Sequence, residues 1–318
     1  MADESWMVPT PVQELVAAVE EPPSQYVLPE QDRPGSPSVA KDIPEPFPVV
    51  DLNRLPDDAA EAAKLRSALQ SWGLVLVTNH GIESSLMHDV MDVSREFFQQ
   101  PLQERQKCSN LIDGEWFQVE GYGNDPVLTE DQILSWNDRL RLKVEPEDER
   151  NYALWPKHPE CFRDVLHEYT SKTKRIRDDM FRAMARILEL DEDHFISQIS
   201  DKAPAFARFT YYPPCPRPEL VNGVQAHSDA GILTILLVHN EVGGLQVQRD
   251  GIWYNVPPKP DTLLINLGDV MEIMNNGVFK SPVHRVLTNA EKERLSLAVF
   301  YGVGEEKARE LGASLLDV

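Results

Sequence analysis

The chain has 318 residues, of which 42% are hydrophobic and 26% are charged, as in a soluble globular protein with one large domain or two ordinary ones. Its formal net charge of −21 argues against nucleic acid or an anionic membrane as a partner, because both select for concentrated Lys and Arg. Its three cysteines are widely spaced, and neither a signal peptide nor a membrane span is indicated, so we expect a cytoplasmic protein.

The N-terminal part begins with residues 1–46, which are rich in Pro, Glu and Ser. This composition predicts an extended or loosely ordered arm with a short helix around 12–19. Ordered structure is expected from residue 47 onward. Hydrophobic periodicity then predicts, in chain order, a strand at 47–52, an amphipathic helix at 57–71, a buried strand at 73–78, a helix at 84–100 and, after an irregular stretch at 110–150, a long helix at 159–190.

From about residue 205 the pattern changes to short strands separated by Gly, Pro and Asn, which predicts a sandwich or jelly roll. The expected fold class is therefore α+β, with N-terminal helices that buttress a β-sandwich or jelly-roll core; the family resemblance given below implies the double-stranded β-helix (jelly-roll) form of that core. The strands are expected at 207–211, 231–238, 244–248, 253–256, 262–266 and 295–301. The expected regions are the arm (1–46), a helix-rich region (47–200), the jelly-roll domain (201–304) and a C-terminal tail (305–318).

Two pairs of polar residues in the β-rich part share one spacing. His227 and Asp229 are two residues apart, and so are Arg294 and Ser296. Residues i and i+2 of a strand project to the same face, so the first pair offers an imidazole beside a carboxylate. His284 lies between the two pairs in the sequence. Two histidines and one carboxylate form the facial triad that suits non-haem Fe(II) and leaves coordination positions open.

The Arg294/Ser296 pair offers a bidentate cationic group beside a hydroxyl, which is what a carboxylate-bearing co-substrate needs. Together the two pairs predict an iron oxygenase that consumes a keto acid. The H-x-[DE] spacing alone is a weak signal, since about one is expected by chance in this composition. Two others occur: Pro159 disfavours a strand at His158/Glu160, and His239/Glu241 lies in a stretch typical of a hairpin turn.

Other interpretations stay open at this point. A single histidine is more often a surface or core residue than a ligand, and Arg294 has Glu291 and Glu293 nearby as salt-bridge partners. The triad residues are also compatible with a structural zinc site. Zinc prefers a closed tetrahedral set, often with Cys, and Cys215 is the nearest in sequence.

A larger set of motifs extends over nearly the whole chain from Pro48 onward. They are Trp72-Gly73, Asn79-His80-Gly81, Tyr211-Tyr212-Pro213-Pro214-Cys215-Pro216, His227-Ser228-Asp229, Gly244-Leu245-Gln246-Val247, Asn266-Leu267-Gly268-Asp269, Asn276-Gly277, Lys280-Ser281, His284-Arg285 and Arg294-Leu295-Ser296. With this set the chain resembles the plant 2-oxoglutarate- and Fe(II)-dependent dioxygenases. The resemblance implies an oxidoreductase that couples decarboxylation of 2-oxoglutarate to hydroxylation, or a related C–H oxidation, of a small organic molecule. It implies Fe(II), 2-oxoglutarate and O2 as requirements, with ascorbate in a supporting role.

By position, the resemblance makes His227, Asp229 and His284 the iron ligands and catalytic residues. It implies that Arg294 and Ser296 grip the distal carboxylate of 2-oxoglutarate.

Four further positions belong to the expected site. The resemblance implies that Tyr212 helps to bind 2-oxoglutarate, and Thr210 stands where many members of the class have an asparagine. Phe300 matches a position that often faces the organic substrate. Tyr122 and Trp136 are the other expected pocket walls, and plain packing explains these two equally well.

Within the class, the likeness extends to the cereal HIS-like oxygenases, which are associated with sensitivity to inhibitors of 4-hydroxyphenylpyruvate dioxygenase and can hydroxylate triketone herbicides. Residues 1–6 and the stretch Glu120-Gly121-Tyr122-Gly123 carry this likeness. It implies a triketone or a plant secondary metabolite as substrate. We expect a monomer, because nothing in the sequence demands a larger assembly. The chain ends at Val318, where members of the class usually continue into a further helical segment. The alternative expectation is therefore a catalytically impaired relative that binds a metal or a small molecule.

Overall fold

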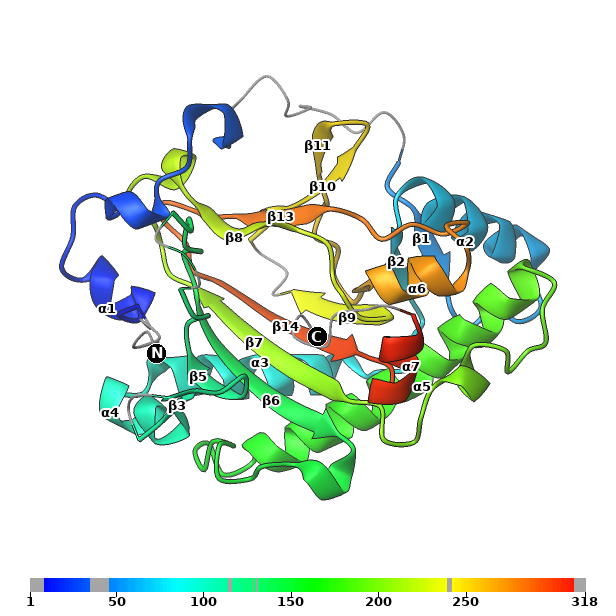
Figure 1. The fold of residues 1–318 in the computed structure, drawn as a ribbon, viewed down its shortest axis with the longest axis horizontal. Helices are drawn as coiled ribbons and strands as arrows, with labels where there is room; N and C mark the ends of the chain where they lie inside the picture. The colour runs from blue at the N-terminus through cyan, green and yellow to red at the C-terminus, as the bar shows by residue number, and fades with distance from the viewer. Residues whose placement is uncertain are drawn as a thin grey trace.

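Two β-sheets, one large and one small, face each other at the centre of the molecule (Figure 1). The computed structural model describes residues 9–34, 46–113, 116–127, 129, 131–238 and 242–311. Helices cover the outer face of the large sheet, and the small sheet lies over its inner face (Figure 1). This architecture confirms the predicted α+β class with a jelly-roll core.

The large sheet has eight strands in the described residues, in the order β1-β2-β12-β9-β14-β7-β6-β5. Strands β1 and β2 pair in parallel, and every other neighbouring pair is antiparallel. The strands are β1 (Val49–Asp51), β2 (Leu74–Thr78), β5 (Gly121–Gly123), β6 (Asp138–Glu145), β7 (Ala205–Tyr212), β9 (Leu233–Val238), β12 (Leu263–Leu267) and β14 (Arg294–Tyr301). The region that was expected to be helix-rich thus also supplies four strands of this sheet.

The small sheet is antiparallel, with the order β11-β10-β13-β8. Its strands are β8 (Asn222–His227), β10 (Leu245–Arg249), β11 (Ile252–Asn255) and β13 (His284–Leu287). A separate pair consists of β3 (Leu111–Ile112) and β4 (Trp116–Phe117).

Two long helices, α3 and α5, supply most of the helical cover. The seven α-helices of the described residues are α1 (Val12–Val16), α2 (Ala59–Ser71), α3 (Ser84–Gln99), α4 (Leu102–Arg105), α5 (Phe162–Ile187), α6 (Asp269–Met274) and α7 (Glu305–Glu310). Short 3-10 turns lie at Ser24–Tyr26, Glu30–Asp32, Gln106–Cys108, Glu147–Glu149, Ile196–Gln198 and Pro218–Leu220.

Helix α5 packs through an apolar stripe, as its sequence pattern predicts. Phe162, Leu166, Tyr169, Met180 and Met184 recur at helical spacing and are all buried. A fully buried side chain of this size contributes about 1.5–3 kcal/mol of hydrophobic stabilisation. The stripe therefore holds α5 firmly against the large sheet.

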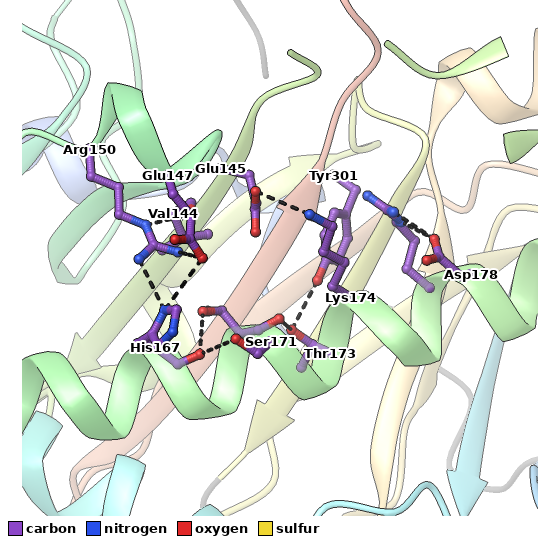
Figure 2. A network of polar contacts seen from close by, with 12 residues as sticks. Val144, Glu145, Glu147, Arg150, His167, Ser171, Thr173, Lys174, Asp178 and Tyr301 are labelled. Atoms are coloured by element: carbon purple, nitrogen blue, oxygen red, sulfur yellow. Dashed lines mark hydrogen bonds and ion pairs between the residues drawn. The ribbon is translucent and has the colours of Figure 1, made fainter. Parts of the chain in front are cut away.

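Polar contacts also fix α5 to the strands beneath it (Figure 2). Tyr301 at the end of β14 donates a buried hydrogen bond of 2.9 Å to Thr173. Lys174 lies 3.2 Å from the carboxylate of Glu145 on β6. These contacts keep the helix from sliding along β14, the strand that carries Arg294 and Ser296.

Gly73 connects α2 to β2 with a backbone conformation that favours glycine, at φ +67°. A Cβ atom here would lie 2.4 Å from the carbonyl oxygen of Lys280 and 2.8 Å from Pro282. Both belong to the loop that leads into β13. The Trp72-Gly73 motif therefore lets this loop approach closely and sets the start of β13, where His284 lies.

Two predictions about the N-terminal part are wrong, although α1 confirms the short helix expected around 12–19. Residues 9–34 are packed, with Val12 and Tyr26 buried against Trp136 and Cys215. The stretch at 110–150 contains β6 and is therefore not irregular throughout. The expected features at residues 1–8, 35–45, 239–241 and 312–318 lie outside the described residues; they include the 1–6 motif and the His239/Glu241 pair.

Asp138 joins the N-terminal arm to β6. Its buried carboxylate accepts hydrogen bonds from the backbone N–H groups of Val12 at 2.6 Å and Gln13 at 2.9 Å. Burial outweighs these bonds and raises the pKa of Asp138 to about 6. Because the folded pKa exceeds the unfolded one, the stability from this group is present at low pH and is lost as pH rises through about 6.

We expect Asp138→Asn to remove this pH dependence. The unfolding free energy of the wild type, minus that of the variant, should fall by about 2 kcal/mol between pH 4.5 and 7.5. Urea unfolding at several pH values measures the difference. A difference that is constant or that grows with pH would contradict this account of the arm.

Candidate metal and co-substrate site

Two strands of the small sheet bring two histidines together. His227 ends β8 and His284 begins β13, and the two residues are direct antiparallel partners. Their rings lie 4.3 Å apart between centroids. Asp229 follows two residues after His227, and its Oδ1 atom lies 3.5 Å from Nε2 of His227 and 3.7 Å from Nε2 of His284. The structure therefore joins the three predicted ligands in one cluster.

The backbone fixes which nitrogen of each histidine is available. Nδ1 of His227 lies 2.8 Å from the carbonyl oxygen of Gln225, and Nδ1 of His284 lies 3.0 Å from that of Pro282. A carbonyl can only accept a hydrogen bond, so each Nδ1 carries the proton and donates. Each Nε2 then has its lone pair free and directed at Asp229, as a metal ligand requires.

The carboxylate of Asp229 is oriented by two side chains from the large sheet. Its Oδ2 atom accepts hydrogen bonds from Thr234 at 2.6 Å and from Asn266 at 2.7 Å. Oδ1 is therefore the oxygen that faces the histidines. Burial alone would raise the pKa of Asp229, but His284, His227 and Thr234 outweigh it and hold that pKa well below the usual range.

The donor set fits a two-histidine, one-carboxylate metal site. The ligand atoms of His227, Asp229 and His284 all lie within 4.8 Å of one another, and no fourth His, Cys, Asp or Glu of the described residues joins the group. Cys215 is packed in another cluster, against Tyr26 and Trp136. This set leaves coordination positions open, as an Fe(II) site does, whereas structural zinc prefers a closed tetrahedron.

A cavity of about 100 Å³ opens between the two sheets in front of these ligands. Its wall combines the three ligands with polar and apolar residues of both sheets. Those that bear on the site are Arg208, Thr210, Tyr212, Thr234, Asn266, Arg294, Ser296 and Phe300.

Arg294 supplies a buried positive charge to this cavity. Its side chain donates to the hydroxyl of Ser296 at 3.3 Å and lies over the ring of Tyr212 at 4.8 Å. No carboxylate of the described residues pairs with it, and its buried Nε atom has no partner. Glu293 instead contacts Arg95 and Tyr211, which excludes it as the salt-bridge partner.

A buried guanidinium without a carboxylate partner is costly, and burial accordingly lowers the pKa of Arg294. The cost is offset when an anion enters the cavity. The arrangement therefore fits a carboxylate-bearing co-substrate that reaches from Arg294 toward the metal ligands.

Strand register decides which of the other predicted residues reach the cavity. Thr210 and Ser296 are direct partners on β7 and β14, and Tyr212 is the partner of Arg294, so all four share one face. Phe300 lies on the same face and lines the cavity.

The predictions for Tyr122 and Trp136 as pocket walls are wrong for this cavity. Tyr122 pairs with Leu140, whose side chain points to the opposite face of the sheet. It packs against Phe97 and Phe98 of α3. Trp136 packs edge-on against Tyr26 of the N-terminal arm. Both side chains belong to the core.

The sequence predictions missed Thr234 and Arg208. Asn266 belongs to the Asn266-Leu267-Gly268-Asp269 motif, but the sequence alone assigns no role to its side chain. No sequence pattern marks Thr234 as a functional residue, because a threonine in an apolar strand is common. Arg208 stands two residues before Thr210 in a strand of alternating pattern, so its position on the cavity face could have been predicted.

We expect Thr234→Val to loosen Asp229 without changing the side-chain volume greatly. The loss of one of two orienting hydrogen bonds should weaken Fe(II) binding roughly 10- to 100-fold, as is typical for groups that orient metal ligands. Metal titration of the purified protein measures this. Thr173→Val, which removes a buried hydroxyl on α5, is the matched control. Equal metal affinity in wild type and Thr234→Val would contradict the orienting role.

The fold and the site together define a class: a jelly-roll protein with an open cluster of two histidines and one carboxylate beside a buried arginine that has no carboxylate partner among the described residues. A model of the 2OG-Fe(II) oxygenase superfamily matches residues 205–303, and one described as non-haem dioxygenase in morphine synthesis N-terminal matches residues 47–158. The chain belongs to the plant family of 2-oxoglutarate- and Fe(II)-dependent dioxygenases, and it is an enzyme of that class.

Individual relatives support this assignment over most of the chain. Protein SRG1 of Arabidopsis thaliana is 37% identical over 98% of this chain and 87% of its own length. Codeine O-demethylase of Papaver somniferum is 36% identical over 91% of this chain and 81% of its own length. A crystal structure of JOX2 in complex with 2OG, Fe and JA superimposes with a TM-score of 0.86 at 34% identity, covering 95% of this chain and 86% of that one.

The family assignment confirms the predicted cofactor Fe(II) and co-substrate 2-oxoglutarate. The likeness to the cereal HIS-like oxygenases stays a prediction. Within the described residues, no helix is both long and apolar enough to cross a membrane.

Proposed function

We propose that His227, Asp229 and His284 hold the Fe(II) and that Arg294 and Ser296 hold the distal carboxylate of 2-oxoglutarate. One observation carries this proposal. A single cavity contains both a carboxylate aimed at two free imidazole nitrogens and a buried guanidinium without a carboxylate partner. The carboxylate and the two imidazoles need a metal ion, and the guanidinium needs an anion. Fe(II) and 2-oxoglutarate, which the family uses, meet these two needs.

The protein's own residues then bind, orient and exclude water. Arg294 offers its guanidinium to the distal carboxylate, with the hydroxyl of Ser296 beside it, and Tyr212 and Thr210 complete this end of the cavity. When bound, Fe(II) would supply activation of O2: one oxygen atom would go to 2-oxoglutarate, which would leave as succinate and CO2, and the other would oxidise the organic substrate. Apolar wall residues such as Leu236 and Phe300 keep water from the reacting centre.

We propose a small organic molecule as the substrate, oxidised by hydroxylation or a related C–H oxidation such as demethylation. The relative named codeine O-demethylase supports demethylation as one outcome for this chain. Triketone herbicides and plant secondary metabolites are the substrate classes to test first. We further propose that the enzyme works as a monomer in the cytoplasm and needs no nucleic acid.

A substrate panel tests this proposal. Purified protein with Fe(II), 2-oxoglutarate, O2 and ascorbate is incubated with triketones, flavonoids and other plant metabolites, and succinate and product masses are measured. We expect at least one compound to raise succinate formation and to gain an oxygen atom, lose a methylene unit or lose two hydrogens. If no compound changed and no succinate formed under any condition, the alternative of a binding protein without turnover would replace this proposal.

A further inference from the structure

We infer that the organic substrate carries a planar oxyanion, as a carboxylate or an enolised β-triketone does, and that Arg141 binds it. This inference rests on the proposed function, because it names the substrate class for the same site. It is carried by a group of cationic side chains that sequence reasoning overlooked, on β6 and β7 beside the cavity.

Strand register places these side chains on the cavity face of the large sheet. Arg141 is the direct partner of Arg208, and Arg208 is the direct partner of Ala298. Both Arg208 and Ala298 line the cavity. Arg141 is therefore the next residue outward in the same row, about 5 Å from Arg208 across the sheet. Arg139 lies in the neighbouring row, opposite Thr210.

A single carboxylate serves two of the three arginines. Asp125 accepts from Arg139 at 2.7 Å and from Arg208 at 3.0 Å. Arg139 also donates to the carbonyl oxygen of Gly121. These two guanidinium groups are therefore paired within the protein, each with one oxygen of the Asp125 carboxylate.

Arg141 has no such partner. None of the described residues offers it an ion pair or accepts a hydrogen bond from it, and its Nε atom is buried without a partner. The other acidic side chain whose charge acts on Arg141, Glu120, accepts a hydrogen bond from the backbone N–H of Lys143. Burial, with Arg139 and Arg208 nearby, lowers the pKa of Arg141 to about 9. A half-buried guanidinium without an anionic partner is stabilised when an anion binds to it.

The surroundings of Arg141 suit an anion that is attached to an apolar body. Its guanidinium lies over the ring of Phe206, 4.5 Å from the centroid. Phe206 and Phe300 are direct partners on the same face, so the two rings border the way from Arg141 into the cavity. A ligand with a carboxylate at one end can place it on Arg141 and lay its hydrocarbon part along these rings. Cationic amines are disfavoured by like charge.

This anion site is distinct from that of the co-substrate. Arg141 is two strands away from β14 and in the row of Ala298, four residues beyond Arg294. Strand geometry puts the Cα atoms of Arg141 and Arg294 roughly 16 Å apart. Arg294 lines the cavity, whereas Arg141 lies one strand beyond Arg208, which also lines it. The two arginines are therefore treated as separate anion sites.

Binding of matched neutral and anionic probes tests the inference. Calorimetry is performed without oxygen on protein loaded with Fe(II) and saturating 2-oxoglutarate. The probes are hydrocinnamate and its methyl ester, and a β-triketone and its enol methyl ether. We expect at least one oxyanion to bind about tenfold or more tighter than its neutral partner, and Arg141→Gln to remove that preference while leaving the affinity of the neutral probe unchanged. The pair of probes that shows the preference identifies the kind of oxyanion, a carboxylate or an enolised β-triketone.

Two controls separate this inference from the proposed function. Arg54→Gln removes an exposed arginine far from the cavity in sequence and should leave all affinities unchanged. The visible absorption of the Fe(II)·2-oxoglutarate complex, recorded on the same samples, reports whether the centre is assembled. Two results with normal absorption would contradict the inference: both oxyanions bind no better than their neutral partners, or Arg141→Gln keeps the preference. Neither result would contradict the proposed function. If the absorption is missing in the wild type, the proposed function itself fails.

Discussion

Replacing Asp229 with alanine should abolish 2-oxoglutarate turnover and weaken Fe(II) binding by more than about 100-fold. The carboxylate is the only anionic ligand in the cluster, and the effect should exceed that of losing a group that merely orients it. Without it, the two imidazoles would face Thr234 and Asn266, which then lose their acceptor as well. Succinate formation and metal titration measure the two effects.

Two further variants make this result specific. Asp250→Ala removes an exposed carboxylate and should leave activity and metal affinity unchanged. Asp229→Asn keeps the size and one carbonyl oxygen, so it should fold normally and still lose most of the metal affinity. Wild-type metal affinity in a folded Asp229→Ala protein would rule out this cluster as the iron site.

Replacing Arg294 with alanine should raise the 2-oxoglutarate concentration needed for half-maximal turnover by roughly 100-fold. Truncating one partner of a buried charge pair costs about 2–5 kcal/mol, and each 1.4 kcal/mol is about tenfold in affinity. The metal cluster does not contact Arg294, so Fe(II) affinity in the absence of 2-oxoglutarate should be unchanged. Turnover is measured as succinate formed at a series of 2-oxoglutarate concentrations.

The stability of the Arg294→Ala protein gives a second readout. Removing a buried cation without a carboxylate partner should not destabilise the ligand-free protein by the amount expected of a lost ion pair. Added 2-oxoglutarate should then stabilise the wild type and leave the variant almost unaffected. Arg309→Ala, an exposed arginine on α7, is the control. An unchanged 2-oxoglutarate requirement in Arg294→Ala would place the distal carboxylate elsewhere.

Much of the site could be predicted because its residues follow simple spacing rules. A two-residue spacing in a strand puts Arg294 and Ser296 on one face whatever the rest of the fold does. The pairing of β8 with β13, which brings His284 to His227, could not be deduced from spacing. It depends on the close approach at Gly73 and on a register that only the folded sheet reveals.

The incorrect sequence predictions concern strand register and stretches in which polar and apolar residues are mixed. Tyr122 and Trp136 were expected in the pocket because they are aromatic, but a one-residue change of register moves a side chain to the other face of a sheet. Strand β6 alternates charged and apolar residues, which is a regular strand pattern. The prediction of an irregular stretch at 110–150 overlooks this strand pattern, and with it the position of Arg141 on β6. The buried N-terminal arm was obscured by its polar composition, since Val12 and Tyr26 are isolated apolar anchors.

The most direct test of the whole account is an anaerobic titration of 2-oxoglutarate into the Fe(II)-loaded protein, followed in the visible spectrum. We expect a charge-transfer band that grows to saturation, because the keto acid would chelate an Fe(II) held by His227, Asp229 and His284 while Arg294 would bind its far carboxylate. The absence of a band at any concentration of 2-oxoglutarate, in a folded protein that has bound Fe(II), would contradict the joint metal and co-substrate site.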